Sequence, residues 1–206
     1  MHIAILTFDG FNELDSFIAL GILNRVKAPG WRVSLACPTA AVTSMNGVTV
    51  QAMCTLEQAC EADAVLVGSG LQTRDIARDA GLMARLQFDP ARQLLGAQCS
   101  GTLLLAKLGL LGRLPACTDL LSKPWVQEAG VEVLNQPFHA EGNLATAGGC
   151  LASVYLAAWV IARLQGLDAA RSALHYVAPV GEKALYVDRA IAHLLPGLPA
   201  EAGAAG

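Results

Sequence analysis

Cys99 is the residue of this chain whose surroundings point most directly to chemistry. It lies between two apolar runs, residues 94–98 and 102–106, and Gly101 follows it by two positions. This pattern predicts a strand, a sharp turn and a helix, which together lift one nucleophile above a sheet. Because a helix N-terminus favours an anion, we expect the Cys99 thiolate to form more easily than usual. The alternative is a buried core cysteine without a chemical role.

Two further stretches could complete a site around Cys99. Residues 68–70, Gly-Ser-Gly, directly follow the apolar run 64–67, and small residues at such a place leave backbone N–H groups free to face a ligand. An ordinary strand-to-helix turn explains them equally well. Asp15 lies in the first turn of a predicted helix, where an acid can also simply complement the helix dipole. Since ligands of parallel α/β sheets bind beyond the carboxyl ends of the strands, we expect these residues to converge.

The elements that must position these residues alternate along the chain. Uniformly apolar or alternating runs predict strands at residues 3–8, 31–37, 64–67, 94–98 and 144–147, and extended segments at 131–134 and 137–140. Helical spacing predicts helices at residues 14–26, 56–61, 73–86 with a break near Gly81, 122–128, 150–165, 168–176 capped by Asp168, and 182–194. The pair Asn46-Gly47 predicts a small hairpin. We therefore expect an α/β fold of the flavodoxin-like, three-layer type, with a mostly parallel sheet, helices on both faces and a hairpin insertion.

Composition limits the class of protein. A chain of 206 residues that is 54% hydrophobic and 15% charged can bury a sizeable core in one domain. We expect this domain to span residues 1–195 and to be followed by a flexible tail, 196–206, rich in Ala, Gly and Pro. The mean hydropathy of +0.46 favours a self-association surface and hence a homodimer. The net charge of −3 and the lack of a basic run argue against nucleic-acid binding.

The six cysteines form no CxxC pair, and no signal segment precedes the first predicted strand. We therefore expect reduced thiols in the cytoplasm, no metal site and no cofactor. Residues 144–162 lack charge and are almost long enough to cross a membrane. Gly148 and Gly149 interrupt this run, so a strand followed by a buried helix explains it better than a membrane span.

These motifs together resemble the ThiJ/PfpI superfamily, a branch of the class I glutamine amidotransferase-like fold, over roughly residues 2–180. The resemblance rests on residues 8–10 and 14–15 (Phe-Asp-Gly and Leu-Asp), 67–70 (Val-Gly-Ser-Gly), 96–101 (Gly-Ala-Gln-Cys-Ser-Gly) and 142–149 (Gly-Asn-Leu-Ala-Thr-Ala-Gly-Gly). Within the superfamily the chain is most similar to the isocyanide (isonitrile) hydratases. The resemblance also implies a homodimer.

The resemblance implies a role for five residues. Cys99 would be the nucleophile and Asp15 its acidic partner, while the N–H groups of Ser69, Gly70 and Ser100 would form a pocket that binds substrate and a developing oxyanion. The expected substrate is a small molecule. Its reaction would be hydration of an isocyanide to an N-substituted formamide through a thioimidate on Cys99, with Asp15 passing the proton.

The sequence departs from the family pattern in two places. Many relatives have Pro-Gly-Gly where this chain has Gly-Ser-Gly at residues 68–70, so the oxyanion pocket could be reshaped. Many also have a histidine where this chain has Asp119, which weakens a Cys-His protease dyad but not the hydratase interpretation. Two alternatives stay open: a redox or metabolite sensor that uses Cys99, and a hydrolase of the amidase or deglycase type.

Several other residues with chemical potential are better explained by structure. His139 and Glu141 match the His-x-Glu of glutamine amidotransferases, but they fall in a predicted hairpin, so we expect a surface-strand histidine. His175 and His193 lie on late predicted helices, and we expect both to be structural. Three aromatic residues could form pocket walls but fit the core better: Phe11, Trp125 and Tyr155.

Overall fold

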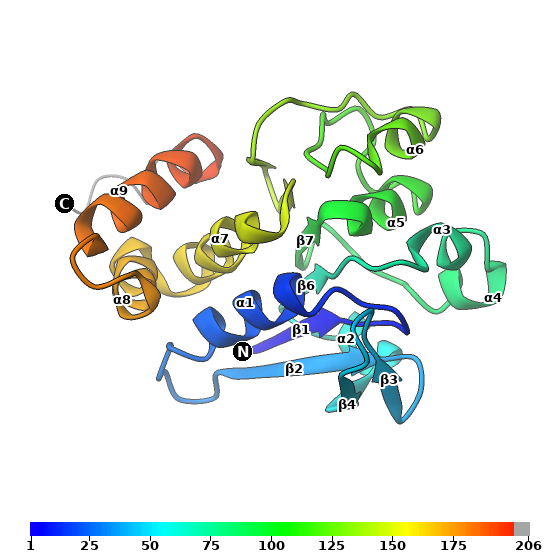
Figure 1. Cartoon of the computed structure of the whole chain (residues 1–206), viewed down its shortest axis with the longest axis horizontal. Coiled ribbons are helices and arrows are strands. Elements are labelled where there is room, and N and C mark those ends of the chain that lie inside the picture. The colour runs from blue at the N-terminus through cyan, green and yellow to red at the C-terminus, as the bar shows by residue number, and fades with distance from the viewer. Residues whose placement is uncertain (200–206) are drawn as a thin grey trace.

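The computed structural model describes residues 1–199, and its centre is a seven-stranded sheet in the order β5-β2-β1-β6-β7-β9-β8 (Figure 1). The strands are β1 (His2–Leu6), β2 (Arg32–Cys37), β5 (Cys54–Thr55), β6 (Ala64–Val67), β7 (Leu94–Gln98), β8 (Phe138–Glu141) and β9 (Leu144–Ala147). All neighbours pair in parallel except β8, which runs antiparallel to β9. The carboxyl ends of β1, β6, β7 and β9 therefore meet at one edge of the sheet.

Helices cover both faces of this sheet (Figure 1). One face packs against α1 (Glu13–Leu23), α7 (Ser153–Gln165), α8 (Leu167–Val177) and α9 (Lys183–Leu194). The other packs against α2 (Leu56–Cys60), α3 (Thr73–Ile76), α4 (Ala80–Met83), α5 (Thr102–Lys107) and α6 (Lys123–Glu128). Successive side chains of a strand point to opposite faces of the sheet, so both faces of β1 are apolar. Ile3 and Ile5 join the core on the first face, and Ala4 and Leu6 join the core on the second.

The predicted three-layer α/β fold is confirmed. The Asn-Gly pair lies between β3 (Ala41–Thr43) and β4 (Thr49–Gln51), which form a separate antiparallel hairpin. The uncharged run 144–162 divides into β9, the short 3-10 helix η2 (Cys150–Ala152) and part of α7. Among the helices of residues 1–199, none is long and apolar enough to cross a membrane.

Several predicted helix boundaries are wrong. The first helix ends at Leu23 and not near residue 26. The helix expected at 73–86 breaks at residues 77–79 and not at Gly81, because Asp79 caps a new helix by accepting the N–H of Leu82 at 2.9 Å. Asp168 does not cap α8. Gly166, with φ +91°, ends α7 and precedes α8, so Asp168 lies in the first turn instead.

The C-terminal segment packs against the sheet as far as it is described. Residues 200–206 of the predicted tail 196–206 lie outside the described residues. The last described element, the 3-10 helix η3 (Leu195–Gly197), lies on β8, and a Cβ added to Gly197 would be 2.6 Å from the Cβ of Ala140. Leu198 then packs against the core.

Candidate functional site

Cys99 occupies the sharp turn that the sequence predicts. Strand β7 ends at Gln98, the 3-10 helix η1 (Cys99–Gly101) follows, and α5 continues from it. Cys99 has φ +47°, and no other residue except glycine has a positive φ in residues 1–199. This conformation is costly for a residue with a side chain and is often found at functional sites. The hydroxyl of Thr118 donates to the Cys99 carbonyl at 2.8 Å and helps to hold the turn.

Close backbone contacts bring the turns after β6 and β7 together. A Cβ added to Gly101 would lie 2.6 Å from the carbonyl oxygens of both Val67 and Gly68. A Cβ added to Gly70 would lie 2.6 Å from the carbonyl oxygen of Gly10, in the loop after β1. Side chains at Gly70 and Gly101 are therefore excluded, and their absence allows three loops to meet at the carboxyl edge of the sheet.

Asp15 lies beside Cys99, as the predicted convergence requires. Asn12 caps α1 by accepting the N–H of Leu14 at 3.0 Å, and the face of α1 that contains Asp15 and Ala19 turns inward. Asp15 is only 1% exposed. Its Oδ2 accepts a short hydrogen bond from the Ser69 hydroxyl, whereas Oδ1 has no hydrogen-bond partner among the described residues.

Cys150 joins this pair to form a cluster of three ionisable side chains. One carboxylate oxygen of Asp15 and the sulfurs of Cys99 and Cys150 all lie within 4.8 Å of one another. These atoms could supply three ligands to a thiophilic metal ion, for which a tetrahedral shell would need a fourth ligand from solvent or substrate. The sequence predicts Asp15 and Cys99 but not the third member.

Burial dominates the electrostatics of the cluster. It raises the pKa of the Asp15 carboxyl, and the hydrogen bond from Ser69 opposes this rise only in part. Burial also raises the pKa of the Cys99 thiol, and the negative charge of Asp15 raises it further. The expectation that the helix N-terminus makes the Cys99 thiolate easier to form is therefore wrong. The pair favours states in which at least one of the two groups holds a proton.

The predicted anion pocket is only partly available. The N–H of Gly70 donates to the Ser100 hydroxyl at 3.2 Å, and that hydroxyl also pairs with the Thr73 hydroxyl at 2.8 Å. The N–H groups of Ser69 and Ser100 have no acceptor within residues 1–199. Two of the three predicted donors thus remain for a ligand. Ser69 stands where the family pattern has a glycine, and its hydroxyl donates a hydrogen bond to the Asp15 carboxylate.

The sequence analysis missed Cys150 and the two amide side chains that contact the cluster sulfurs, those of Asn12 and Gln98. Asn12 donates to the sulfur of Cys150 at 3.2 Å. Gln98 donates to the Gly149 carbonyl at 2.8 Å and to the Cys99 sulfur at 3.5 Å. A signal for Cys150 existed, because two glycines follow strand β9 just as small residues follow β6. That signal served only to predict a helix start.

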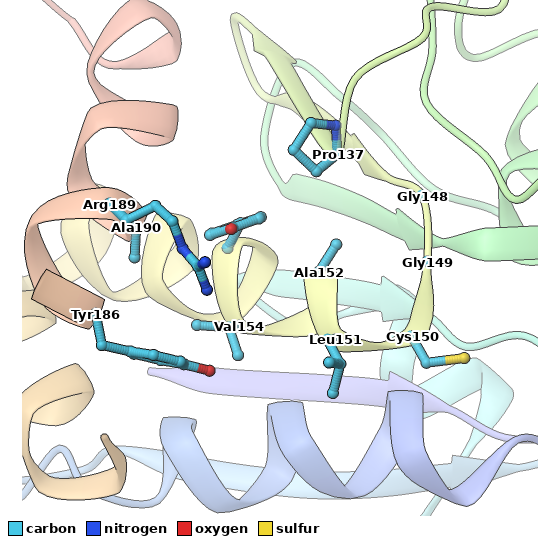
Figure 2. A pocket seen from close by; sticks show the side chains of 11 residues that line it. Pro137, Gly148, Gly149, Cys150, Leu151, Ala152, Val154, Tyr186, Arg189 and Ala190 are labelled. Carbon is cyan, nitrogen blue, oxygen red and sulfur yellow. The ribbon is translucent and has the colours of Figure 1, made fainter. Parts of the chain in front are cut away.

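A cavity of about 390 Å³ opens next to this cluster, between the loop after β9 and helices α7 and α9 (Figure 2). Its lining includes Gly149, Cys150, Tyr155, Tyr186 and Arg189. The Cys150 side chain stands at one end of the cavity, and its sulfur points away from the end where Tyr186 and Arg189 lie (Figure 2). The cavity therefore borders the cluster without containing Cys99 or Asp15.

The other candidates lie elsewhere, apart from Tyr155, which lines this cavity. Phe11 is buried in a small core cluster, and Trp125 stacks under Arg74 on the opposite helical layer. His139 is half-buried on β8, and the ring of His193 packs against Tyr155 with 4.7 Å between centroids. The groups that shift the pKa of Cys99 include no histidine.

The comparisons with known proteins agree with this fold. The sequence profile of the DJ-1/PfpI family matches residues 1–163. Among solved structures, DJ-1 from Schizosaccharomyces pombe is 16% identical, with a TM-score of 0.75 over 87% of this chain and 100% of that chain. A ThiJ/PfpI family protein from Pseudomonas syringae is 18% identical, with a TM-score of 0.76 over 95% and 88%. A DJ-1 superfamily protein from Salmonella typhimurium, solved as a cysteine-to-alanine mutant, is 25% identical, with a TM-score of 0.73 over 85% and 97%. No curated protein matches the sequence.

Proposed function

Because this chain belongs to the DJ-1/PfpI family, we propose that Cys99 is the nucleophile of an enzyme that hydrates an isocyanide to an N-substituted formamide. The main observation behind this proposal is the pairing of the Cys99 thiol with a buried carboxyl, Asp15, whose pKa is raised. Such a carboxyl keeps its proton to a higher pH than an exposed one and can deliver it to a reacting atom. Within residues 1–199, the groups that shift the pKa of Cys99 include no histidine, which disfavours a Cys-His dyad for peptide hydrolysis.

The reaction consumes one water and needs a proton transfer at each of its three steps. Cys99 attacks the isocyanide carbon, and the thiol proton reaches the adduct through Asp15, which gives a thioimidate. Water adds to the carbon–nitrogen double bond of the thioimidate, with the proton moving to nitrogen. Collapse of this adduct breaks the carbon–sulfur bond, releases the N-substituted formamide and returns the thiol.

The surrounding groups fit these steps. The Ser69 hydroxyl fixes Asp15 through Oδ2 and leaves Oδ1 free for proton exchange with Cys99. The N–H groups of Ser69 and Ser100 are available to stabilise charge that develops on the adduct. The cavity that Tyr155 lines has room for the organic substituent of a small isocyanide.

Turnover of an aryl isocyanide tests the proposal. Wild type should form the formamide and Cys99→Ala should not, whereas Cys60→Ala should keep the wild-type rate. Cys60 is a suitable control because its buried thiol contacts the Arg85 carbonyl, away from the cluster. Formamide formation by Cys99→Ala, or its absence with wild type, would contradict the proposal.

We also propose that the protein works as a homodimer in a reducing, cytoplasmic compartment. Large apolar side chains stay exposed on the single chain, including Leu120, Leu121, Leu151 and Leu185. All six cysteines are free, as expected where thiols stay reduced. Sedimentation of the purified chain at several concentrations measures its mass, and a monomer throughout would contradict the dimer.

A further inference from the structure

Cys150 has no role in the proposed hydration, although its sulfur lies within 4.8 Å of the Cys99 sulfur. The two thiols differ in burial, since Cys99 is 4% exposed and Cys150 is half-buried at one end of the cavity. A disulfide requires the sulfurs to approach to about 2 Å. The remaining gap is small enough to be closed by a local movement.

The structure allows that movement on the Cys150 side. Cys150 begins the 3-10 helix η2 and follows Gly149, which has φ +89° and open space where a Cβ would be. The Cys150 sulfur accepts one hydrogen bond, from the Asn12 amide at 3.2 Å. Cys99, in contrast, is fixed by the packed turn of Gly101. Rotation of the Cys150 side chain, together with a small shift of η2, would bring the sulfurs together.

We propose that Cys150 is the resolving thiol of Cys99 when the protein meets a hydroperoxide. This inference rests on the proposed nucleophilicity of Cys99 but not on an isocyanide substrate. In the first step the Cys99 sulfur attacks the hydroperoxide, the oxygen–oxygen bond breaks, and Cys99 sulfenic acid and an alcohol, or water from hydrogen peroxide, are formed. In the second step the Cys150 sulfur attacks Cys99, the sulfur–oxygen bond breaks, and a Cys99–Cys150 disulfide and water are formed.

Asp15 is placed to assist the second step. Its carboxylate lies within 4.8 Å of both sulfurs, so it can take the proton from Cys150 and pass it to the leaving hydroxide, which then departs as water. The disulfide stops oxidation at a stage that external thiols reverse. Without Cys150, the sulfenic acid would continue to sulfinic acid, which thiols do not reduce.

The test is a mass measurement on the full chain, reduced and then treated with hydrogen peroxide in the presence of a chelator. Digestion with trypsin and a glutamate-specific protease separates the three relevant cysteines, because Cys99 falls in residues 93–107, Cys117 in 114–128 and Cys150 in 142–163. Wild type and the control Cys60→Ala should yield peptide 93–107 linked to 142–163, lighter by two hydrogens than the two separate peptides. Dithiothreitol should restore both peptides.

Cys150→Ser and Cys150→Ala should instead accumulate sulfinic acid on peptide 93–107, which dithiothreitol does not reverse. The proposal is overturned if wild type forms no link between these peptides, whether Cys99 stays reduced or is oxidised as far as in the Cys150 variants. Because the readout is a mass and not turnover, a failed isocyanide assay leaves this result unaffected. The two proposals can therefore fail separately.

Discussion

Asp15→Asn separates the two effects that we assign to Asp15. The substitution keeps the size of the side chain and an oxygen that can accept the Ser69 hydroxyl, so we expect the fold to persist. It removes the proton that Asp15 relays, which should lower isocyanide turnover by about 10²- to 10⁴-fold. It also removes a negative charge that opposes ionisation of Cys99. Turnover and thiol reactivity should consequently change in opposite directions.

The size of the second effect follows from the distance. At the upper limit of the separation, 4.8 Å, a unit charge contributes on the order of 3 kcal/mol in surroundings with an effective dielectric constant of about 20. This energy corresponds to roughly a hundredfold change in the acid dissociation constant of the thiol. The effect depends on pH because it exists only while Asp15 is ionised. Below the raised pKa of Asp15, wild type and variant should have similar thiolate fractions.

The rate at which iodoacetamide alkylates Cys99, followed on peptide 93–107 across about pH 6 to 9, measures the thiolate fraction of Cys99 in both proteins. Asp15→Asn should react faster wherever Asp15 is ionised in wild type, and the difference between the two rates should shrink as pH falls towards the pKa of Asp15. Equal rates across the whole range, or a slower variant, would refute the electrostatic reasoning. Unchanged turnover in Asp15→Asn would refute the proton relay.

Three further predictions concern the same region. Ser69→Ala removes a hydrogen bond that lowers the pKa of Asp15, so the midpoint of the pH–turnover profile that reflects Asp15 should move upward; an unmoved profile would argue against this link. Burial raises the folded-state pKa of Asp15 above the ordinary 3.8, so the free energy of unfolding of wild type should fall relative to that of Asp15→Asn as pH rises from about 3.8 through the folded-state pKa. Urea denaturation at a series of pH values should show this, and a constant difference would contradict it. Gly101→Ala should lose about 1–3 kcal/mol of stability, because its Cβ would meet two carbonyl oxygens at 2.6 Å, whereas Gly21→Ala in α1, with nothing within 4 Å, should gain about 0.5–1 kcal/mol. Equal urea midpoints for the two glycine variants would contradict the packing argument.

The parts of the site that follow from short-range pattern were predictable. The strand–turn–helix around Cys99 depends on neighbours in sequence, whereas the close approach of Gly101 to Val67 and Gly68 depends on β6 and β7 ending side by side. The meeting of Asp15 with Cys99 required only the knowledge that parallel strands end at one edge of the sheet. These features come from residue type, spacing and topology, which a single sequence contains.

The missed features depend on distances across the fold. The pKa of Cys99 rises because the turn is buried and Asp15 is near, and neither quantity is visible in the local helix-start pattern. The N–H of Gly70 is occupied by Ser100, a residue 30 positions away. Cys150 joins the cluster through Asn12, which is 138 positions away. Side-chain pairings of this kind are fixed by tertiary packing.

The packing of η3 on β8 has a consequence for self-association. An uncovered outer strand offers unpaired backbone groups to another chain, which risks aggregation. At one side of the sheet the outer strand, β5, has only two residues, and at the other β8 is covered at Ala140 by Gly197. Neither edge strand is therefore well placed to pair with a strand of a second copy. The homodimer that we propose must therefore form through helices and loops, and loss of η3 would expose β8 to strand-to-strand addition.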